Sequence, residues 1–297
     1  MSIIQVENVT KIYKSGKGIF DISFSVDQGE VFGYLGPNGA GKTTTIRQLM
    51  GFTNVDQGRC LIRGMDTRLQ AEEIQKFVGY IPGEIAFFNN MTGKQFLDFI
   101  SQMRKQAKSR TAELVTRFEL DVKPKISKMS KGMKQKVALT AAFMHDPEIY
   151  ILDEPTSGLD PLMQKTFIEL ILEEKKRGKT ILMSSHSFEE VERTSDRAGV
   201  IREGRLVALE DVNSLKAAQR KAFIVTVVSS GEVELLQNSN LEISRITGNQ
   251  VEIIISSNYD EFIRVLTKCS VKGLDVLNQN LEQAFMKYYG REAEKNE

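Results

Sequence analysis

A glycine-rich segment from Gly36 to Thr43 reads GPNGAGKT and has the spacing G-x-x-x-x-G-K-[ST]. Glycines let the backbone curl so that its N–H groups point at phosphate oxygens, and a following helix adds its positive N-terminal end. Lys42 would reach the outer phosphates, and Thr43 would ligate Mg²⁺. The flanking strand and helix patterns favour a phosphate site over an ordinary turn. The candidate binding residues are Gly36, Pro37, Asn38, Gly39, Ala40, Gly41, Lys42, Thr43 and Thr44.

A nucleotide–metal site also needs a carboxylate, and two acidic residues follow the apolar run IYIL. A carboxylate at the end of a buried strand is costly unless a cation lies beside it, so Asp153 is the expected metal ligand. Glu154 should project the other way and activate the attacking water, and positioned general bases contribute about 10²- to 10⁴-fold. An isolated run of this kind can also end in a solvated pair, but the upstream phosphate loop favours the metal site.

Three further segments separate this chain from other phosphate-loop proteins. The segment MSKGMKQK opens a helix, and Ser130 at its N-cap, with the free N–H groups of the first turn, can bind an anion. Alone, this segment is only a capped helix. SGLD follows at Ser157, directly after DEP. His186 follows the strand TILMSS, which should neighbour the DE strand, whereas His145 lies at a helix end and has no assigned role.

The order of these segments resembles the ATP-binding subunits of ABC transporters, from residue 36 to 186 in its motifs and from about 3 to 215 in its pattern. SKGMKQK resembles the LSGGQ signature, with lysine and methionine replacing glycine and glutamine. The resemblance implies that Ser130, Lys131 and Gly132 contact ATP held by another subunit. It makes Glu154, His186 and Lys42 the catalytic residues, with Thr43 and Asp153 at the metal. Tyr13 would stack on adenine, or it is a surface strand tyrosine.

One element departs from the family pattern. After a strand like FVGYIP the family usually carries a glutamine that senses Mg²⁺ and the membrane partner, but this chain has Gly83 there. Either Glu84 substitutes for the glutamine or the contact is absent. The next segment lies where the family docks a permease, so Phe87 and Phe88 would form that contact or belong to the core of a helical insertion.

Strands that alternate with helices predict an α/β fold with a mainly parallel sheet. With the resemblance, the expected class is a P-loop NTPase of ABC type, with N-terminal antiparallel strands and a helical subdomain over about 85–145. Residues 1–220 should form the ATPase domain and 221–297 a C-terminal accessory α+β domain. In that second domain we expect strands at AFIVTVV, LEISRIT, QVEIIIS and GLDVLN and helices at YDEFIRVLTKC and LEQAFMKYY.

Composition limits the kinds of partner. The 297 residues carry 40 basic and 39 acidic side chains, a net charge of +1, which argues against a protein that coats nucleic acid. The balance hides an asymmetry, because residues 222–297 hold 7 basic and 11 acidic side chains and the remainder holds 33 and 28. The longest uncharged stretch has eleven residues, Val31–Gly41, whereas a spanning helix needs about 20. Two distant cysteines fit a reducing compartment.

These observations predict an ATP-binding and hydrolysing subunit, with ATP and Mg²⁺ as cofactors, that powers an ABC transporter through head-to-tail dimerisation. The resemblance implies separate transmembrane permease subunits, a second copy or paralogue of this chain, and a peripheral place on the cytoplasmic face of the membrane. The variant signature, the glycine at position 83 and the added C-terminal domain favour an exporter. The alternative is a soluble ABC ATPase acting on nucleic acid or ribosomes, but the chain has neither room for long coiled coils nor a second ATPase core. A module with dead sites is disfavoured by intact Lys42, Asp153, Glu154 and His186.

Overall fold

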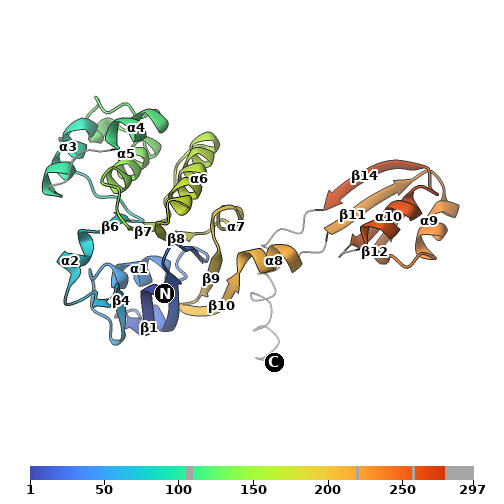
Figure 1. Cartoon of the computed structure of the whole chain (residues 1–297), viewed down its shortest axis with the longest axis horizontal. Helices are drawn as coiled ribbons and strands as arrows, with labels where there is room; N and C mark the ends of the chain where they lie inside the picture. Colours follow the sequence, from blue (N-terminus) through green and yellow to red (C-terminus); the bar gives the residue numbers. More distant parts are fainter. Residues whose placement is uncertain (105–109, 219–220, 256–257, 278–297) are drawn as a thin grey trace. The chain divides into compact units, whose positions relative to one another are not determined.

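The computed structural model describes residues 1–104, 110–218, 221–255 and 258–277. The chain divides into two compact units, Met1–Val212 and Asn213–Glu297, and each is described by itself (Figure 1). The division therefore precedes the boundary that the sequence placed at residue 220, and helix α8 (Val212–Ala218) starts where the first unit ends. The assignment of an ATPase domain to 1–220 and an accessory domain to 221–297 stays a prediction.

A six-stranded sheet forms the centre of the first unit. Its spatial order is β10-β9-β3-β8-β7-β6, parallel throughout except for β10, which pairs antiparallel with β9. The order does not follow the chain, because β3 lies between β8 and β9. The strands are β3 (Val31–Leu35), β6 (Val78–Ile81), β7 (Ile149–Asp153), β8 (Thr180–Ser185), β9 (Arg197–Arg202) and β10 (Arg205–Asp211).

Both faces of this sheet are covered, which explains why the central strands β3 and β7 are buried and mostly apolar. Tyr150 and Leu152 of β7 pack into one core cluster, while Ile149 and Ile151 pack into the other, because successive side chains of a strand point to opposite faces. The first cluster takes in helices α5 (Lys131–Phe143) and α6 (Pro161–Lys176). The second takes in α1 (Lys42–Leu49) and the N-terminal sheet.

The N-terminal sheet is antiparallel and has the order β2-β1-β4-β5. Its strands are β1 (Ser2–Ile12), β2 (Gly18–Asp27), β4 (Gln57–Ile62) and β5 (Met65–Asp66), and α2 (Ala71–Gln75) follows. Helix α1 contacts β4 of this sheet and β7 of the central sheet, so it lies between the two. The sequence predicted β1 and β2, whereas β4 and β5 were not anticipated.

The helical region between β6 and β7 contains α3 (Gly93–Met103), α4 (Thr111–Arg117), a 3₁₀ turn (Ile126–Lys128) and α5. In Figure 1 these helices gather beyond β6, away from β1, β4 and α1. Thr92 and Gln95 form a reciprocal capping box at the start of α3. Ser130 caps α5 and Asp160 caps α6, with Pro161 at the first helical position.

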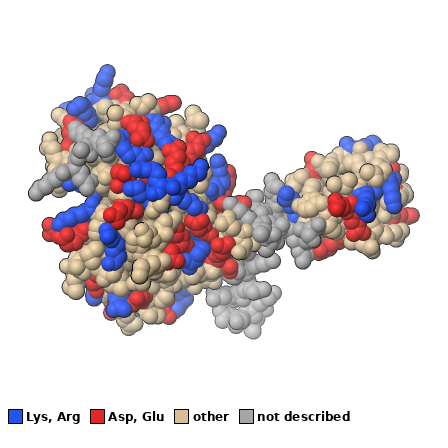
Figure 2. All heavy atoms as spheres, in the orientation of Figure 1, with Lys and Arg blue, Asp and Glu red and all other residues tan. Residues whose placement is uncertain are grey.

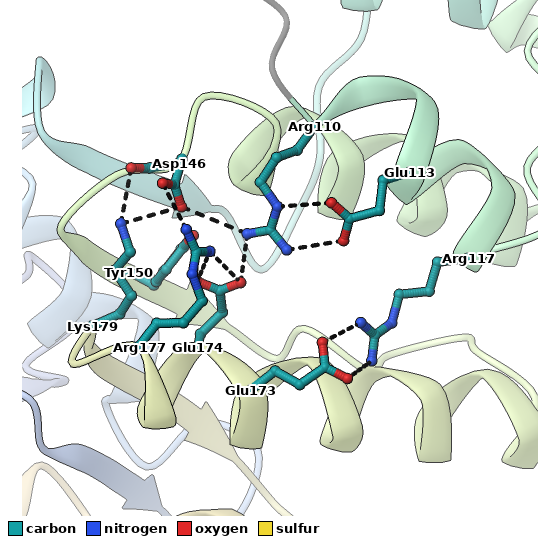
Figure 3. Close-up of polar contacts among 9 residues, drawn as sticks. All are labelled: Arg110, Glu113, Arg117, Asp146, Tyr150, Glu173, Glu174, Arg177 and Lys179. Carbon is teal, nitrogen blue, oxygen red and sulfur yellow. Dashed lines mark hydrogen bonds and ion pairs between the residues drawn. The ribbon is translucent and has the colours of Figure 1, made fainter.

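A network of ion pairs joins this helical region to α6 (Figure 3). Glu174 of α6 is fully buried, and its carboxylate accepts hydrogen bonds from Arg110 at the start of α4 and from Arg177. The Tyr150 hydroxyl donates to the same carboxylate over 3.4 Å. A buried carboxylate is tolerated only when its charge and lone pairs are matched, and these partners provide the match.

The second unit has a four-stranded antiparallel sheet of order β12-β13-β11-β14 with two helices on it. Its elements are β11 (Lys221–Val227), α9 (Ser230–Gln237), β12 (Glu242–Thr247), β13 (Gln250–Ile255), α10 (Tyr259–Leu266) and β14 (Val271–Leu277). Helix α9 was not predicted, although Ser229 and Glu232 carry its capping-box signal. The closing helix expected at LEQAFMKYY lies outside the described residues.

Candidate nucleotide site

Most of the predicted site residues meet at one edge of the central sheet, where the parallel strands β3, β8, β7 and β6 all end. Crevices outside the carboxyl ends of parallel strands are the usual ligand sites of such sheets. A pocket of about 530 Å³ opens there. The residues that line it are Tyr13, Lys17, Gly18, Asn38, Gly39, Gly41, Lys42, Thr43, Thr44, Arg47, Gly83, Glu84, Glu154, Ser157 and His186.

The glycine-rich loop wraps around the ammonium of Lys42. Gly39 and Gly41 have φ values of 80° and 114°, which side-chain-bearing residues rarely adopt, so the glycines permit the curl. Lys42 Nζ donates to the carbonyl oxygens of Gly36, at 2.6 Å, and Pro37, at 3.1 Å. The lysine side chain is only 5% exposed, so a positive charge lies at the centre of the loop.

Glu154 joins the lysine to the histidine. One carboxylate oxygen lies 3.0 Å from Lys42 Nζ, and the other lies 2.6 Å from His186 Nδ1. Glu154 has a φ of 51°, a left-handed conformation that is unfavourable for a residue with a side chain. Its N–H donates to Ser184 Oγ on β8 at 3.0 Å, which helps to hold this backbone. Three residues distant in sequence thus form one connected chain of ionisable groups.

Asp153 has the surroundings of a cation ligand. It is completely buried, and its Oδ1 accepts a hydrogen bond of 2.6 Å from Ser184, whereas Oδ2 has no hydrogen-bond partner. A Cβ placed on Gly83 would lie 2.8 Å from Asp153 Oδ2 and 3.5 Å from Thr43 Oγ1. The two oxygens therefore approach the same point beside Gly83. A buried, unpartnered carboxylate oxygen next to a hydroxyl fits a hard cation such as Mg²⁺.

The other predicted residues of the loop fall into three groups. Asn38, Gly39, Gly41, Thr43 and Thr44 line the pocket, while Gly36 and Pro37 act through their carbonyl groups. Ala40 is buried in the core cluster under the loop and does not line the pocket.

Tyr13 lies in the turn after β1 rather than inside a strand, and it lines the pocket with its ring about one-third exposed. Its N–H donates to the Lys17 carbonyl oxygen at 2.8 Å, which closes the turn.

The signature residues stand apart from this pocket. Ser130 Oγ accepts a hydrogen bond of 3.2 Å from Met133 N–H, which caps α5. Lys131 Nζ donates to Ser157 Oγ at 3.0 Å, and a Cβ on Gly132 would lie 2.8 Å from the Gly158 carbonyl oxygen. The start of α5 is therefore packed on the SGLD loop. Ser130, Lys131 and Gly132 are absent from the pocket lining.

Sequence reasoning missed two features of the site. Lys17 and Arg47 line the pocket and add positive charge; Arg47 is four residues after Thr43 on α1, a helical spacing that could have revealed it. Glu190 is 6% exposed, and burial raises its pKa to about 7.

The segment after β6 also becomes clearer. Glu84 lines the pocket and Gly83 adds no side chain. Phe87 packs against the core cluster of the helical region, with its ring 5.0 Å from that of Phe96. Phe88 is 56% exposed and contacts Phe99 in an edge-to-face pair. Phe87 is thus a core residue, and Phe88 is the exposed one of the pair.

Comparisons with known proteins show which family and which relatives this chain is similar to. The family model described as ABC transporter matches residues 19–157. The linearmycin resistance ATP-binding protein of Bacillus subtilis is 32% identical, over 97% of this chain and 99% of that protein. The bacitracin transport ATP-binding protein of Bacillus licheniformis is 34% identical, over 97% of this chain and 98% of that protein.

Solved structures of ATP-binding cassettes have a fold similar to that of this chain. An ATP-binding subunit of an ABC transporter superposes with a TM-score of 0.66 at 29% identity, over 72% of this chain and 92% of that chain. A dimeric ATP-binding cassette bound to ADP and phosphate superposes with a TM-score of 0.62 at 22% identity, over 70% and 98%, and shows the fold alone.

Proposed function

Because this chain belongs to the family of ABC transporter ATP-binding subunits and is an ATPase, we propose that its pocket binds Mg²⁺·ATP and that two such subunits pair head to tail to power a transporter. The predicted fold class, an α/β P-loop fold of ABC type, is confirmed by the same comparisons. ATP binding follows from the family. The metal, the pairing, the membrane partner and the roles of single residues are the proposal.

The chain of contacts Lys42–Glu154–His186 is the observation that carries this function. Lys42 places a positive charge where the outer phosphates of a nucleotide lie, and Glu154 stands beside it with a carboxylate able to take a proton from water. His186 holds the other carboxylate oxygen and so orients the base. In this arrangement Lys42 leaves Glu154 for phosphate when nucleotide binds, which frees the carboxylate for its role.

Thr43 and Asp153 would hold the metal. Within the residues described, no group of three or more His, Cys, Asp or Glu side chains could hold an ion. This fits Mg²⁺, which is usually bound by one or two protein oxygens together with phosphates and waters. The ion, when bound, neutralises charge on the phosphate oxygens. Glu84 lines the pocket beside Gly83, which stands where the family usually carries glutamine, and we propose that the Glu84 carboxylate substitutes for that side chain.

Pairing explains the position of the signature. Ser130 and Gly132 lie at the N-terminus of α5, away from the pocket of their own chain, so one copy has a phosphate loop and a signature that do not meet. The free N–H groups of a helix start favour phosphate oxygens. A head-to-tail pair brings each signature onto the nucleotide of the partner. A dimeric cassette bound to ADP and phosphate is known among chains of the same fold.

We propose that separate permease subunits carry out transport across the membrane. No helix in the described part of the chain is long and apolar enough to cross a bilayer. Two relatives are named for bacitracin transport and linearmycin resistance, which supports an exporter with separate permease subunits and a place on the cytoplasmic face of the membrane. The exposed ring of Phe88 is the proposed permease contact. Over the face seen in Figure 2, basic and acidic side chains are interspersed, which gives no support to nucleic-acid binding.

The central experiment for this function is light scattering of the Glu154→Gln variant with ATP and no Mg²⁺. Losing the carboxylate removes the base and also the charge that competes with phosphate for Lys42. We expect a stable ATP-bound dimer under these conditions. With Mg²⁺ added, ATP turnover of the same variant should be lowered about 10²-fold or more. Glu148→Gln, an exposed residue before β7, is the matched control and should behave as the parent. A Glu154→Gln chain that binds ATP but stays monomeric would contradict the pairing.

Detergent extraction tests the membrane partner separately. The chain should co-purify with a hydrophobic permease, and Phe88→Ser should lose that partner while its ATP turnover is kept, because Phe88 lies outside the nucleotide pocket. Ribosomes or DNA in place of the permease would reverse the assignment.

A further inference from the structure

A buried carboxylate lies behind the catalytic pair. Glu190 belongs to α7 (Phe188–Thr194), and its carboxylate faces the two loops that carry Glu154 and His186. It does not line the nucleotide pocket, and the proposed reaction assigns it no role. A buried acidic group is costly unless its contacts serve a purpose, so its partners are informative.

Each of the two loops donates to the same oxygen of Glu190. Ser185 Oγ, from the end of β8, donates to Glu190 Oε2 at 2.5 Å, and Thr156 Oγ1, from the loop after β7, donates to it at 3.4 Å. Ser187 N–H in turn donates to Ser185 Oγ at 2.9 Å. Ser185 and Ser187, which flank His186, are therefore joined to each other, and the Ser185 side chain is held by the Glu190 carboxylate.

This arrangement differs from an ordinary helix cap. Ser187 caps α7 and receives the Glu190 N–H at 3.3 Å, as in a capping box. In the usual box the glutamate side chain reaches back to the N-cap N–H. Here the Ser187 N–H goes to Ser185 instead, and the Glu190 side chain binds Ser185 and Thr156. The carboxylate links two loops rather than closing its own helix.

We infer that Glu190 is a positioning residue that links the loop after β7 to the loop after β8 and so fixes His186 against Glu154. The inference rests on the proposed function, because it concerns the geometry of that catalytic pair. Near-attack geometry is sensitive to small displacements, so a loosened histidine lowers turnover without weakening nucleotide binding. Binding is expected to persist because Glu190 does not touch the phosphate loop.

Steady-state ATP turnover of Glu190→Ala and Glu190→Gln tests this role. Glu190→Ala removes both contacts and should lower kcat about 10- to 100-fold with KM for ATP changed less than about threefold. Glu190→Gln keeps an acceptor oxygen for Ser185 and Thr156, so it should restore most of the lost kcat. Glu189→Gln is the matched control, because Glu189 is the neighbouring residue, is 80% exposed and pairs with Arg193 in its own helix.

Ser185→Ala provides a second variant, and its effect in the parent chain tests the link by itself if Glu190→Ala folds poorly. It should lower kcat in the parent and add little in a Glu190→Ala background, because the two side chains act through one contact. Independent, additive losses, or a Glu190→Ala chain that keeps full kcat per folded molecule, would overturn the inference. Failure of the proposed function looks different, since the unaltered chain would then show no turnover dependent on Glu154.

Discussion

The surroundings of Lys42 place its ammonium group to bind an anion. The glycine loop holds its ammonium against two carbonyl oxygens and a carboxylate in a site that is almost closed to solvent. The carbonyl groups orient the side chain, and the only full negative charge beside it is Glu154. In the proposed function a nucleotide phosphate, which carries more charge than that carboxylate, replaces Glu154 beside Lys42.

The Lys42→Ala variant should therefore keep its folded structure but bind nucleotide more weakly. It removes charge-assisted contacts and leaves Glu154 as an unbalanced negative charge near the phosphates, so ATP binding should weaken about 10- to 100-fold. Isothermal titration with ATP measures this. Lys94→Ala, an exposed lysine paired with Asp98 on α3, should bind ATP normally. Equal affinities for Lys42→Ala and the parent would remove Lys42 from the site.

Glu190 should make the stability of the folded chain depend on pH. Burial raises its pKa from 4.5 to about 7, so the folded chain holds a proton that the unfolded chain releases between these values. Its stabilising contribution is complete below pH 4.5 and is lost as the pH rises through 7, by about 3 kcal/mol. The charged groups around it are Glu154 and His186 from the two loops, Lys165 from α6, and Glu189 and Arg193 from its own helix.

Urea unfolding at pH 5 and pH 8 should show this loss in the parent. Glu190→Gln cannot titrate, so its free energy of unfolding should fall less over the same interval. If the parent and the variant lose the same free energy, Glu190 does not hold the proton.

Residue types and spacing were enough to find the loop, Asp153, Glu154 and His186, because each stands in a local pattern. They were not enough to find Glu190 or Ser184. The contact of Ser184 with Asp153 spans 31 residues, and it exists only because β7 and β8 are neighbours in register. Such contacts depend on strand pairing, which no local pattern reports.

At the scale of elements, α6 ties the nucleotide site to the helical region. Its first turn follows the SGLD loop, and its last turn carries the buried Glu174 that binds Arg110 of α4 (Figure 3). The same helix carries Glu173 one residue earlier, which pairs with Arg117 at a more exposed position. The two neighbouring glutamates thus join the same two helices at different depths.

Glu174→Ala and Glu173→Ala separate the two depths. Removing Glu174 takes away the buried carboxylate that binds Arg110 and Arg177 and should cost about 2–3 kcal/mol of unfolding free energy. Removing Glu173 breaks a surface pair and should cost about 0–1 kcal/mol. Chemical denaturation of both variants decides, and equal costs would show that the buried network does not anchor α4 to α6.

Helices could be predicted from the sequence where an N-cap residue and a helical spacing of apolar residues occur together, as after Thr92, Ser130 and Asp160. The order of the sheet could not be predicted in this way, because β3 lies between β8 and β9, some 150 residues away in the chain. Helix α9 was missed although its capping box was present, since the short segment SGEVELLQ lacks a clear apolar stripe. Glu232 accepts from both Ser229 N–H and Ser270 N–H, which ties that helix to β14 only after folding.

For the whole molecule, the separation of the phosphate loop from the signature is the decisive feature. One chain has one of each, and the α5 start packs on its own SGLD loop instead of the pocket. In the proposed pair, two chains related by a two-fold axis would exchange these surfaces and produce two equal composite sites. The central claim is that Ser130 acts on the nucleotide of the partner.

Ser130→Asp is designed for this claim. Aspartate caps a helix as well as serine does, so α5 should remain intact, while its negative charge should repel the partner's phosphates. Ser130→Asn, which also caps well and is neutral, is the matched control and should keep most of the turnover. Lys42→Ala damages the other half of each composite site.

Mixing the Ser130→Asp and Lys42→Ala chains and measuring ATP turnover is the most direct test. Each variant alone has two damaged sites, but a mixed pair has one site with both defects and one with none. The account predicts that turnover reappears on mixing, up to about a quarter of the parent's activity if chains pair at random. If the mixture stays as inactive as its components while the unaltered chain is active, the signature acts within its own chain and the head-to-tail account is wrong.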